Sequence, residues 1–197
     1  MNDVTYAAPR PGFSPLDLRA RPLATKAAAV LLGTLVLALS SQISVPMVPV
    51  PVTMQTLAVT LIGALYGWRL ATLTILAWLL EAALGLPVLA SGKAGLAPFI
   101  GPTGGYLFAF PIVGALVGWL AERGWNGGRP TLAFVSMLAG NALCLLLGAL
   151  WLATLIGPER AIMAGVVPFL LGGVLKSALG AAILTALGRR WRRGERG

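Results

Sequence analysis

The chain has 197 residues, of which 57% are hydrophobic and only 11% are charged, and its formal net charge is +9. Because a soluble domain carries about 25% charged residues, this composition excludes an ordinary soluble protein and predicts an integral membrane protein. The length accommodates roughly five to seven spanning helices and no additional soluble domain. The basic residues border apolar runs instead of forming a binding surface, so we expect membrane lipids and no nucleic acid as partners.

Six hydrophobic segments follow a polar, proline-rich stretch at the start of the chain. They cover residues of about 24–45, 55–67, 69–87, 104–121, 131–156 and 161–188. Their length and spacing predict an all-α integral membrane protein with six transmembrane helices in one domain, residues 23–188. A cytoplasmic tail, residues 1–22, is expected before this domain, and a basic cytoplasmic tail, residues 189–197, after it.

The distribution of basic residues predicts the orientation of these helices. With both termini in the cytoplasm, the outer loops carry only Lys93 and Arg160, and all other basic residues outside the spans fall on the inner side. This asymmetry is the one that the positive-inside rule describes, and it predicts a multi-pass protein of the cytoplasmic membrane. The C-terminal arginines are then expected to face the anionic lipids of the inner leaflet.

Two of the segments have unusual features. The second is short, and the chain enters it through the proline-rich stretch VPMVPVPVTMQT, residues 45–56. The sixth contains Pro168 and the pair Gly172 and Gly173, which weaken a helix and free backbone groups. We expect an interruption there, next to protein or to a wet cavity that satisfies those groups.

Small residues recur at four-residue spacing at the start of the first helix: Ala20, Ala24 and Ala28. Such a face lets another helix approach closely. Because it lies at a membrane boundary, we expect it to contact a partner subunit.

The residue types exclude most catalytic mechanisms. The chain has no histidine, one cysteine and no glycine-rich phosphate-binding loop that ends in Gly-Lys-Ser/Thr. This removes Ser-His nucleophiles, clustered metal ligands and a nucleotide site of this type. We therefore expect neither an enzyme nor a bound metal or cofactor.

Two ionisable residues, Glu81 and Lys176, fall within predicted spans. A charge at that depth costs about 3 kcal/mol, so it indicates a specific partner. One interpretation is an ion pair that joins the third and sixth helices, and the other is contact with a polar ligand. Gln55 and Asn141 add amides that both donate and accept hydrogen bonds, although Asn141 also suits a contact between helices.

A glycine-rich stretch, residues 90–110, leads from an outer loop into the fourth helix. Thr103 is placed to cap that helix, and the amides of Gly104 and Gly105 would attract an anion. Tyr106 adds a hydroxyl on the first turn. An ordinary capped loop is the simpler alternative.

Together these features predict a pocket toward the outer face. Its expected floor is Glu81, Asn141 and Lys176, and its expected wall is Gly104, Gly105 and Tyr106. Its expected lid consists of Pro49, Val50, Pro51, Val52 and Thr53, because prolines reduce the entropy that a loop loses on closing.

Three motifs in order, PVPVTMQTLAVTLIGALYG, GLPVLASG and GPTGGYLFAF, resemble the BioY family, the biotin-binding S components of energy-coupling-factor (ECF) transporters. The resemblance implies a six-helix protein of a bacterial cytoplasmic (inner) membrane that captures biotin from outside. It implies a loop after the first helix that closes over the ligand. It also implies that the small residues of the first helix contact a transmembrane coupling subunit, which works with two cytoplasmic ATPases, although some members are taken to function alone.

One position departs from this family. Members often carry Asp three residues before the lysine of the sixth helix, where this chain has Gly173. We hypothesise that Glu81 replaces the missing carboxylate, either directly or by orienting Lys176.

Biotin itself suggests a role for each polar residue. Glu81 or Asn141 would accept from the ureido ring and Lys176 would donate to it. Tyr106, the two glycine amides and Lys93 would hold the carboxylate, and Gln55 would reach either end of biotin.

Two alternative functions are an S component for another small vitamin and a channel or packing subunit. The clustering of polar residues in the outer half favours a closed pocket over a channel. The sequence leaves open the energy source for uptake and whether the chain forms a homo-oligomer.

Overall fold

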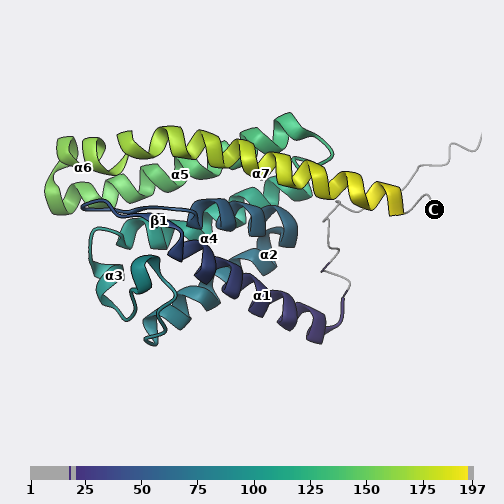
Figure 1. Cartoon of the computed structure of the whole chain (residues 1–197), viewed down its shortest axis with the longest axis horizontal. Helices are drawn as coiled ribbons and strands as arrows, with labels where there is room; N and C mark the ends of the chain where they lie inside the picture. Colours follow the sequence, from purple (N-terminus) through teal and green to yellow (C-terminus); the bar gives the residue numbers. More distant parts are fainter. Residues whose placement is uncertain (1–17, 19–20, 195–197) are drawn as a thin grey trace, which may run out of the picture.

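The computed structural model describes residue 18 and residues 21–194. Helices α1 (Leu23–Gln42), α2 (Gln55–Ala83), α4 (Gly104–Glu122), α5 (Pro130–Ile156), α6 (Pro158–Gly165) and α7 (Val167–Gly194) form the body of the molecule. The short helix α3 (Ala97–Ile100), the 3-10 turn η1 (Ala90–Gly92) and a hairpin of β1 (Ser44–Val45) and β2 (Val52–Thr53) lie at one end of it (Figure 1). By length and composition, five helices in the described part can span a membrane.

Helix α2 contains two crossings, because the chain reverses at Gly67. This residue has φ 75° and ψ 166°, which is not helical. Tyr66, just before the turn, donates its hydroxyl to the Ala29 carbonyl near the start of α1. Gln42, at the end of α1, reaches the Leu89 carbonyl just beyond the end of α2. The two halves of α2 therefore run in opposite directions, which agrees with the six predicted crossings.

Helix α4 packs against this reversal at the inner end of the molecule. The backbone N–H of Trp68 donates to Oε1 of Glu122 at 3.2 Å. Gly118 lies directly over the turn, and a Cβ at that position would come within 2.5 Å of the Trp68 nitrogen. The absence of a side chain at Gly118 therefore lets α4 contact the turn and both halves of α2.

The predicted interruption of the sixth segment is confirmed in part. Helix α6 ends at Gly165 and α7 begins at Val167, so the break falls just before Pro168. Proline is tolerated in a first helical turn, where no N–H is needed. The expected break at Gly172 and Gly173 is wrong, because both residues lie within the continuous helix α7.

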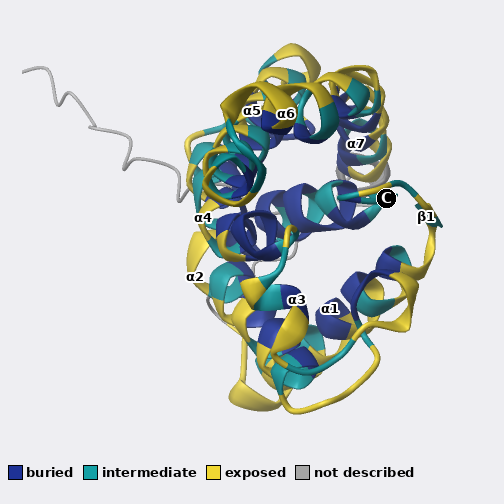
Figure 2. Ribbon diagram, turned by 90° about the vertical axis from the view of Figure 1, so that its left-hand side faces the viewer, coloured by how far each residue is buried: buried dark blue, intermediate teal, exposed yellow. Residues whose placement is uncertain are grey.

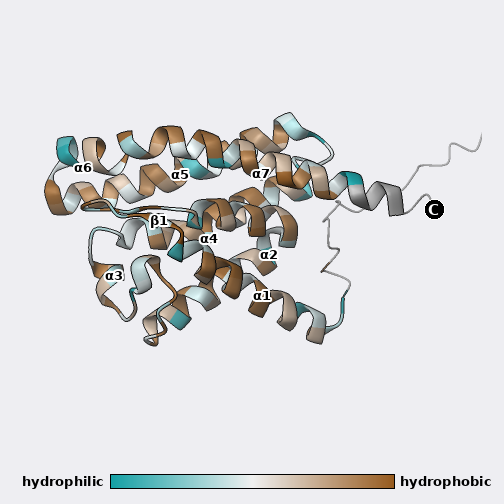
Figure 3. Cartoon of the chain, in the orientation of Figure 1, coloured by the Kyte–Doolittle hydropathy of each residue, from teal (hydrophilic) through white to brown (hydrophobic). Residues whose placement is uncertain are grey.

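The outward faces of the long helices are apolar, as a membrane protein requires. Leu31 and Leu39 of α1 and Leu171 of α7 are each at least 60% exposed. Figure 2 shows exposed residues along the outer faces of α1, α5 and α7, and Figure 3 shows that much of this surface is hydrophobic. Lipid chains would cover it at no cost in unsatisfied polar groups.

Candidate substrate site

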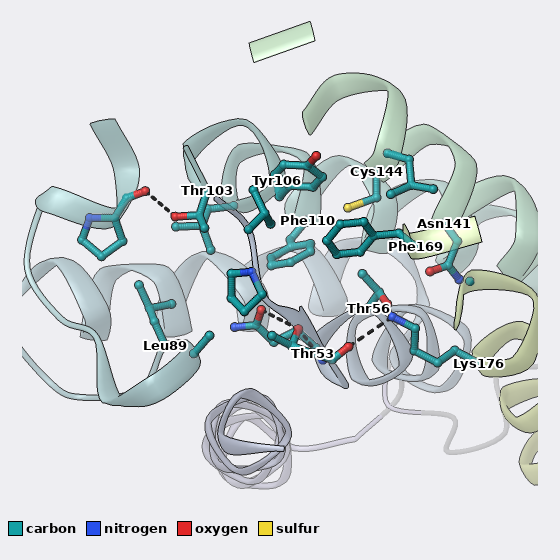
Figure 4. Close-up of a pocket in the computed structure, with 18 of the residues that line it drawn as sticks. Thr53, Thr56, Leu89, Thr103, Tyr106, Phe110, Asn141, Cys144, Phe169 and Lys176 are labelled. Atoms are coloured by element: carbon teal, nitrogen blue, oxygen red, sulfur yellow. Dashed lines mark hydrogen bonds between the residues drawn. The ribbon is translucent and has the colours of Figure 1, made fainter. Parts of the chain in front are cut away.

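A cavity lies between the α1–α2 connection and the outer halves of α4, α5 and α7 (Figure 4). It contains about 720 Å³ of space, including the part that opens to solvent. Pockets for small ligands commonly have mostly apolar walls with a few polar groups that fix the orientation of the ligand. Leu107, Phe110 and Phe169 supply apolar wall here, and the polar groups come from separate elements.

The connection between α1 and α2, residues 43–54, covers the cavity and is called the lid below. It is a β-hairpin in which Ser44 pairs with Thr53 and Val45 with Val52. Of the five residues predicted to form the lid, Val50, Pro51 and Thr53 line the cavity. Val52 lines a groove toward α7, and Pro49 lines a shallow hollow outside. Thr53 lines this groove as well as the cavity, whereas Val52 lines the groove alone.

Lys176 of α7 is buried, with 9% of its surface exposed, and it reaches the base of the lid. Its Nζ donates to the Thr53 carbonyl at 3.1 Å and to Oγ1 of Thr56 at 2.6 Å. An ammonium has three donors, so these two bonds leave one N–H for the cavity that Lys176 lines. The partners of Lys176 are thus neutral oxygens of the lid and of α2, not a carboxylate.

Asn141 of α5 supplies an acceptor to the same wall as Lys176 (Figure 4). Its Nδ2 donates to the Met137 carbonyl at 3.0 Å and to Oγ of Ser177 at 3.1 Å. These bonds use both amide hydrogens. Within the described part of the chain no donor reaches Oδ1, so the carbonyl oxygen is available to a ligand. Asn141 therefore combines the two interpretations of its role, contact between helices and contact with a ligand.

Gln55 lines the cavity, but protein groups already occupy its amide. Its Nε2 donates to Oγ of Ser41 at 2.9 Å, and its Oε1 accepts from Oγ1 of Thr53 at 2.9 Å. The residue thus joins α1, α2 and the lid. The prediction that Gln55 reaches an end of the ligand remains a prediction that would require rearranging these bonds.

Tyr106 contributes its ring to the cavity, where it stacks on Phe169 with 6.2 Å between ring centroids. Its hydroxyl donates to the Gly165 carbonyl at 2.8 Å, at the end of α6. This bond directs the polar end of the side chain toward the α6–α7 break. The expected use of the hydroxyl to hold a carboxylate does not fit this geometry.

Glu81 does not lie among the residues that line the cavity. The predicted span extended to residue 87, whereas α2 ends at Ala83, so Glu81 occupies the last turn of that helix at the outer boundary. Its side chain is partly exposed there, while Lys176 bonds to Thr53 and Thr56. The interpretation as an ion pair with Lys176 is therefore wrong, and so is the prediction that Glu81 orients Lys176.

The two glycines at the start of α4 serve packing. Among described atoms, the backbone of Phe99 and the ring of Trp151 lie against Gly104, and the Trp151 side chain lies against Gly105. Neither glycine lines the cavity. Thr103 does not cap the helix, because its hydroxyl donates to the Pro98 carbonyl at 2.9 Å. The predicted anion site at this helix start therefore lies outside the cavity and stays a prediction.

Lys93 stands at the mouth of the cavity. The residue is exposed, and it lines both the cavity and the shallow hollow outside, where Pro49 and Thr103 are its neighbours. Its side chain places a positive charge on the route from the outer solution. This position suits the anionic end of a ligand.

Several lining residues were missed at the level of sequence: Thr56, Leu89, Phe110, Cys144 and Phe169. Two of them had a usable signal. Thr56 adjoins Gln55, and Phe110 follows Tyr106 by one helical turn, which places both rings on one face. Phe169 and Cys144 had no signal, because apolar residues in a membrane helix face lipid, protein or ligand with similar composition.

Comparison with known proteins places this chain in a family. The BioY family model matches residues 13–193. The chain belongs to the BioY family. It is 40% identical over 149 residues to the probable biotin transporter BioY of Pyrococcus horikoshii, covering 74% of this chain and 87% of that protein. It is 36% identical over 143 residues to biotin transporter BioY2 of Lactococcus lactis, covering 72% and 78%.

A solved structure has the same fold as this BioY family member. The crystal structure of the S-component for biotin from an ECF-type ABC transporter superposes with a TM-score of 0.75 at 24% identity, covering 86% of this chain and 95% of that chain. The family match confirms the predicted resemblance, and the likeness to this structure confirms the all-α membrane fold. The chain is a multi-pass protein of the cytoplasmic membrane, as the basic residues indicated.

Proposed function

We propose that the chain captures biotin from the outer side of the membrane and mediates its uptake, as the substrate-binding component of an ECF transporter or as a solitary transporter. The observation that carries this proposal is one apolar cavity beneath a lid, with a free donor on Lys176 and a free acceptor on Asn141 on the same wall. The names of the relatives support biotin as the substrate.

The polar groups of biotin match those of the cavity. The ureido ring needs both an acceptor and a donor, which Oδ1 of Asn141 and Nζ of Lys176 supply. The thioether ring suits the aromatic wall of Phe110 and Phe169. The valerate carboxylate would then point toward Lys93 at the mouth. Each pairing matters because an unpaired buried polar group costs about 1–3 kcal/mol.

Transport would need further chains or a gradient, since the chain has no P-loop motif. We propose that the coupling subunit of an ECF transporter, with its two ATPases, acts on the α1 face. Ala24 and Ala28 are exposed on α1, as such contact requires, while Ala20 lies outside the described residues. No catalytic role is proposed for the chain itself.

Biotin binding to the purified protein tests the substrate. We expect one labelled biotin per chain, displaced by unlabelled biotin and not by other water-soluble vitamins, and biotin in the mass spectrum of ligand released by denaturation. Displacement by a different vitamin would favour the other S-component hypothesis. Folded protein without saturable binding would favour a channel or packing subunit and overturn the proposal.

Glu81→Gln is expected to leave the dissociation constant for biotin within about twofold of the original, because Glu81 lies outside the cavity. Equilibrium binding and thermal unfolding, each with and without biotin, measure this. Asn141→Leu is the contrasting variant, since it removes an acceptor from the cavity wall. A tenfold loss of affinity in Glu81→Gln would restore the carboxylate hypothesis.

Ala24→Trp and Ala28→Trp are expected to preserve biotin binding and to abolish uptake in cells that also contain the coupling subunit and ATPases. A bulky ring on this face prevents the close helix contact that small residues allow. Val36→Trp, at another exposed position of α1, is the control. Normal uptake by both alanine variants would mean that the partner docks elsewhere.

A further inference from the structure

Ser41, in the last turn of α1, connects that helix to the lid. It is fully buried and does not line the cavity. Its hydroxyl donates to the Leu37 carbonyl at 2.7 Å and accepts from Nε2 of Gln55 at 2.9 Å. Gln55 in turn accepts from the Thr53 hydroxyl at 2.9 Å through Oε1. A continuous chain of hydrogen bonds therefore runs from α1 to strand β2 of the lid.

Thr53 is also held from the opposite side. Lys176 of α7 donates to its carbonyl oxygen at 3.1 Å, whereas the link from Ser41 ends on its side chain. The side chain of Thr53 is buried, and the Thr53 hydroxyl also accepts from the backbone N–H of Gln55 at 3.3 Å. Two links, one from α1 and one from α7, thus fix the residue at which the lid joins α2.

We propose that Ser41 is a positioning residue that holds the lid over the cavity through Gln55 and thereby sets how long the ligand stays bound. The identity of that ligand rests on the proposed function, but the closed position of the lid does not. Both links end on protein groups, so the ligand is not needed to complete them. A buried hydrogen bond contributes modestly to stability, but leaving one of its two partners buried and unsatisfied costs more free energy. Removing the Ser41 hydroxyl leaves the Gln55 amide without its acceptor and loosens the lid.

Ser40 provides a matched control for this idea. Its hydroxyl also donates to the Leu37 carbonyl, at 2.8 Å, but it has no bond to the lid. Ser40→Ala and Ser41→Ala therefore remove the same type of bond within the helix. Only Ser41→Ala also removes the link to Gln55.

The position of the lid can be followed with a single thiol. Cys144 is the only cysteine, so a Cys144→Ala background allows a unique cysteine at Val50, a lid residue that lines the cavity and is only 5% exposed. Val48→Cys, at a 95% exposed position of the lid, reports the unhindered rate. The rate of maleimide modification of Val50→Cys relative to Val48→Cys then measures how often the lid opens.

Ser41→Ala is expected to raise the modification rate of Val50→Cys and the dissociation rate of biotin by about three- to tenfold, and Ser40→Ala to leave both within about twofold. Thr53→Val removes the next bond in the chain, so its effect on modification should not add to that of Ser41→Ala. Equal rates in Ser40→Ala and Ser41→Ala would overturn the proposal. So would fully additive effects of Ser41→Ala and Thr53→Val.

This experiment separates the present proposal from the proposed function. The modification rates are measured without ligand, so they test the lid even if biotin fails to bind. Tight biotin binding with unchanged modification of Val50→Cys in Ser41→Ala would retain the function and reject the role of Ser41. Faster modification of Val50→Cys in Ser41→Ala, in a protein that does not bind biotin, would support the role of Ser41 and reject the proposed function.

Discussion

Lys176→Met is expected to weaken biotin binding by at least tenfold, the largest effect of any substitution in the cavity. Methionine retains the length and the apolar stem but removes the ammonium that bonds to the Thr53 carbonyl and to Thr56. The ligand would lose a charged donor, and hydrogen bonds to charged groups contribute about 1.5–3 kcal/mol. The lid would lose its link to α7 at the same time. Titration with labelled biotin measures the change.

Lys26→Met is the control for this substitution. Lys26 lies in the first turn of α1, near the inner end, so its replacement removes the same charge far from the cavity. Thermal unfolding without biotin separates a lost contact from a damaged fold. A dissociation constant for Lys176→Met equal to that of Lys26→Met would exclude Lys176 from the site.

Gly67→Ala is expected to cause the largest loss of stability among the glycine substitutions, because the turn at Gly67 creates the second and third crossings. Its φ of 75° and ψ of 166° belong to a region that is essentially restricted to glycine, and strain there costs about 1–3 kcal/mol. A Cβ would also approach Oε1 of Glu122 to 2.5 Å, and this carboxylate accepts from the Trp68 N–H. The melting temperature in detergent should fall by several degrees, because each kcal/mol of lost stability lowers it by about 2–4 °C.

Gly172→Ala is the matched control, since Gly172 is helical and the nearest atom to a Cβ there is Cε of Lys176 at 3.9 Å. It should melt at the original temperature or slightly above it, because alanine favours a helix interior. Similar melting temperatures for Gly67→Ala and Gly172→Ala would show that the turn tolerates a side chain. The strain argument would then be wrong.

The membrane fold could be predicted from the sequence because its main determinants are local. Apolar runs partition into lipid one by one, and basic residues next to them fix their orientation. The reversal between the second and third crossings was predicted correctly for the same reason, although α2 is continuous apart from Gly67. The prediction of a lid has a similar local basis, because proline and valine in an outer loop suit neither a helix nor exposure to water; three of its five residues line the cavity.

The partners of the polar side chains could not be predicted in this way. The predicted spans place Glu81 and Lys176 at membrane depth, which makes an ion pair one interpretation, but α2 ends four residues before the predicted boundary. The pattern of Gly104 and Gly105 predicts an anion site, and only the structure shows that Phe99 and Trp151 pack against these glycines and that neither glycine lines the cavity. In each case the residue type indicates the free-energy cost of burying a polar group without a partner. The neighbour that supplies the partner or the packing contact comes from a distant part of the chain.

By itself, the sequence determined the membrane class, the six crossings and their orientation, and it named candidate residues for a biotin site, of which Glu81, Gly104 and Gly105 lie outside the cavity. Only the tertiary structure decided that Lys176 bonds to the lid, that Asn141 keeps a free acceptor and that Gln55 joins the lid to Ser41. The physical reason is that partitioning depends on the average character of a segment. A hydrogen bond depends instead on bringing two atoms within about 3 Å, which for Lys176 and Thr53 requires the whole fold.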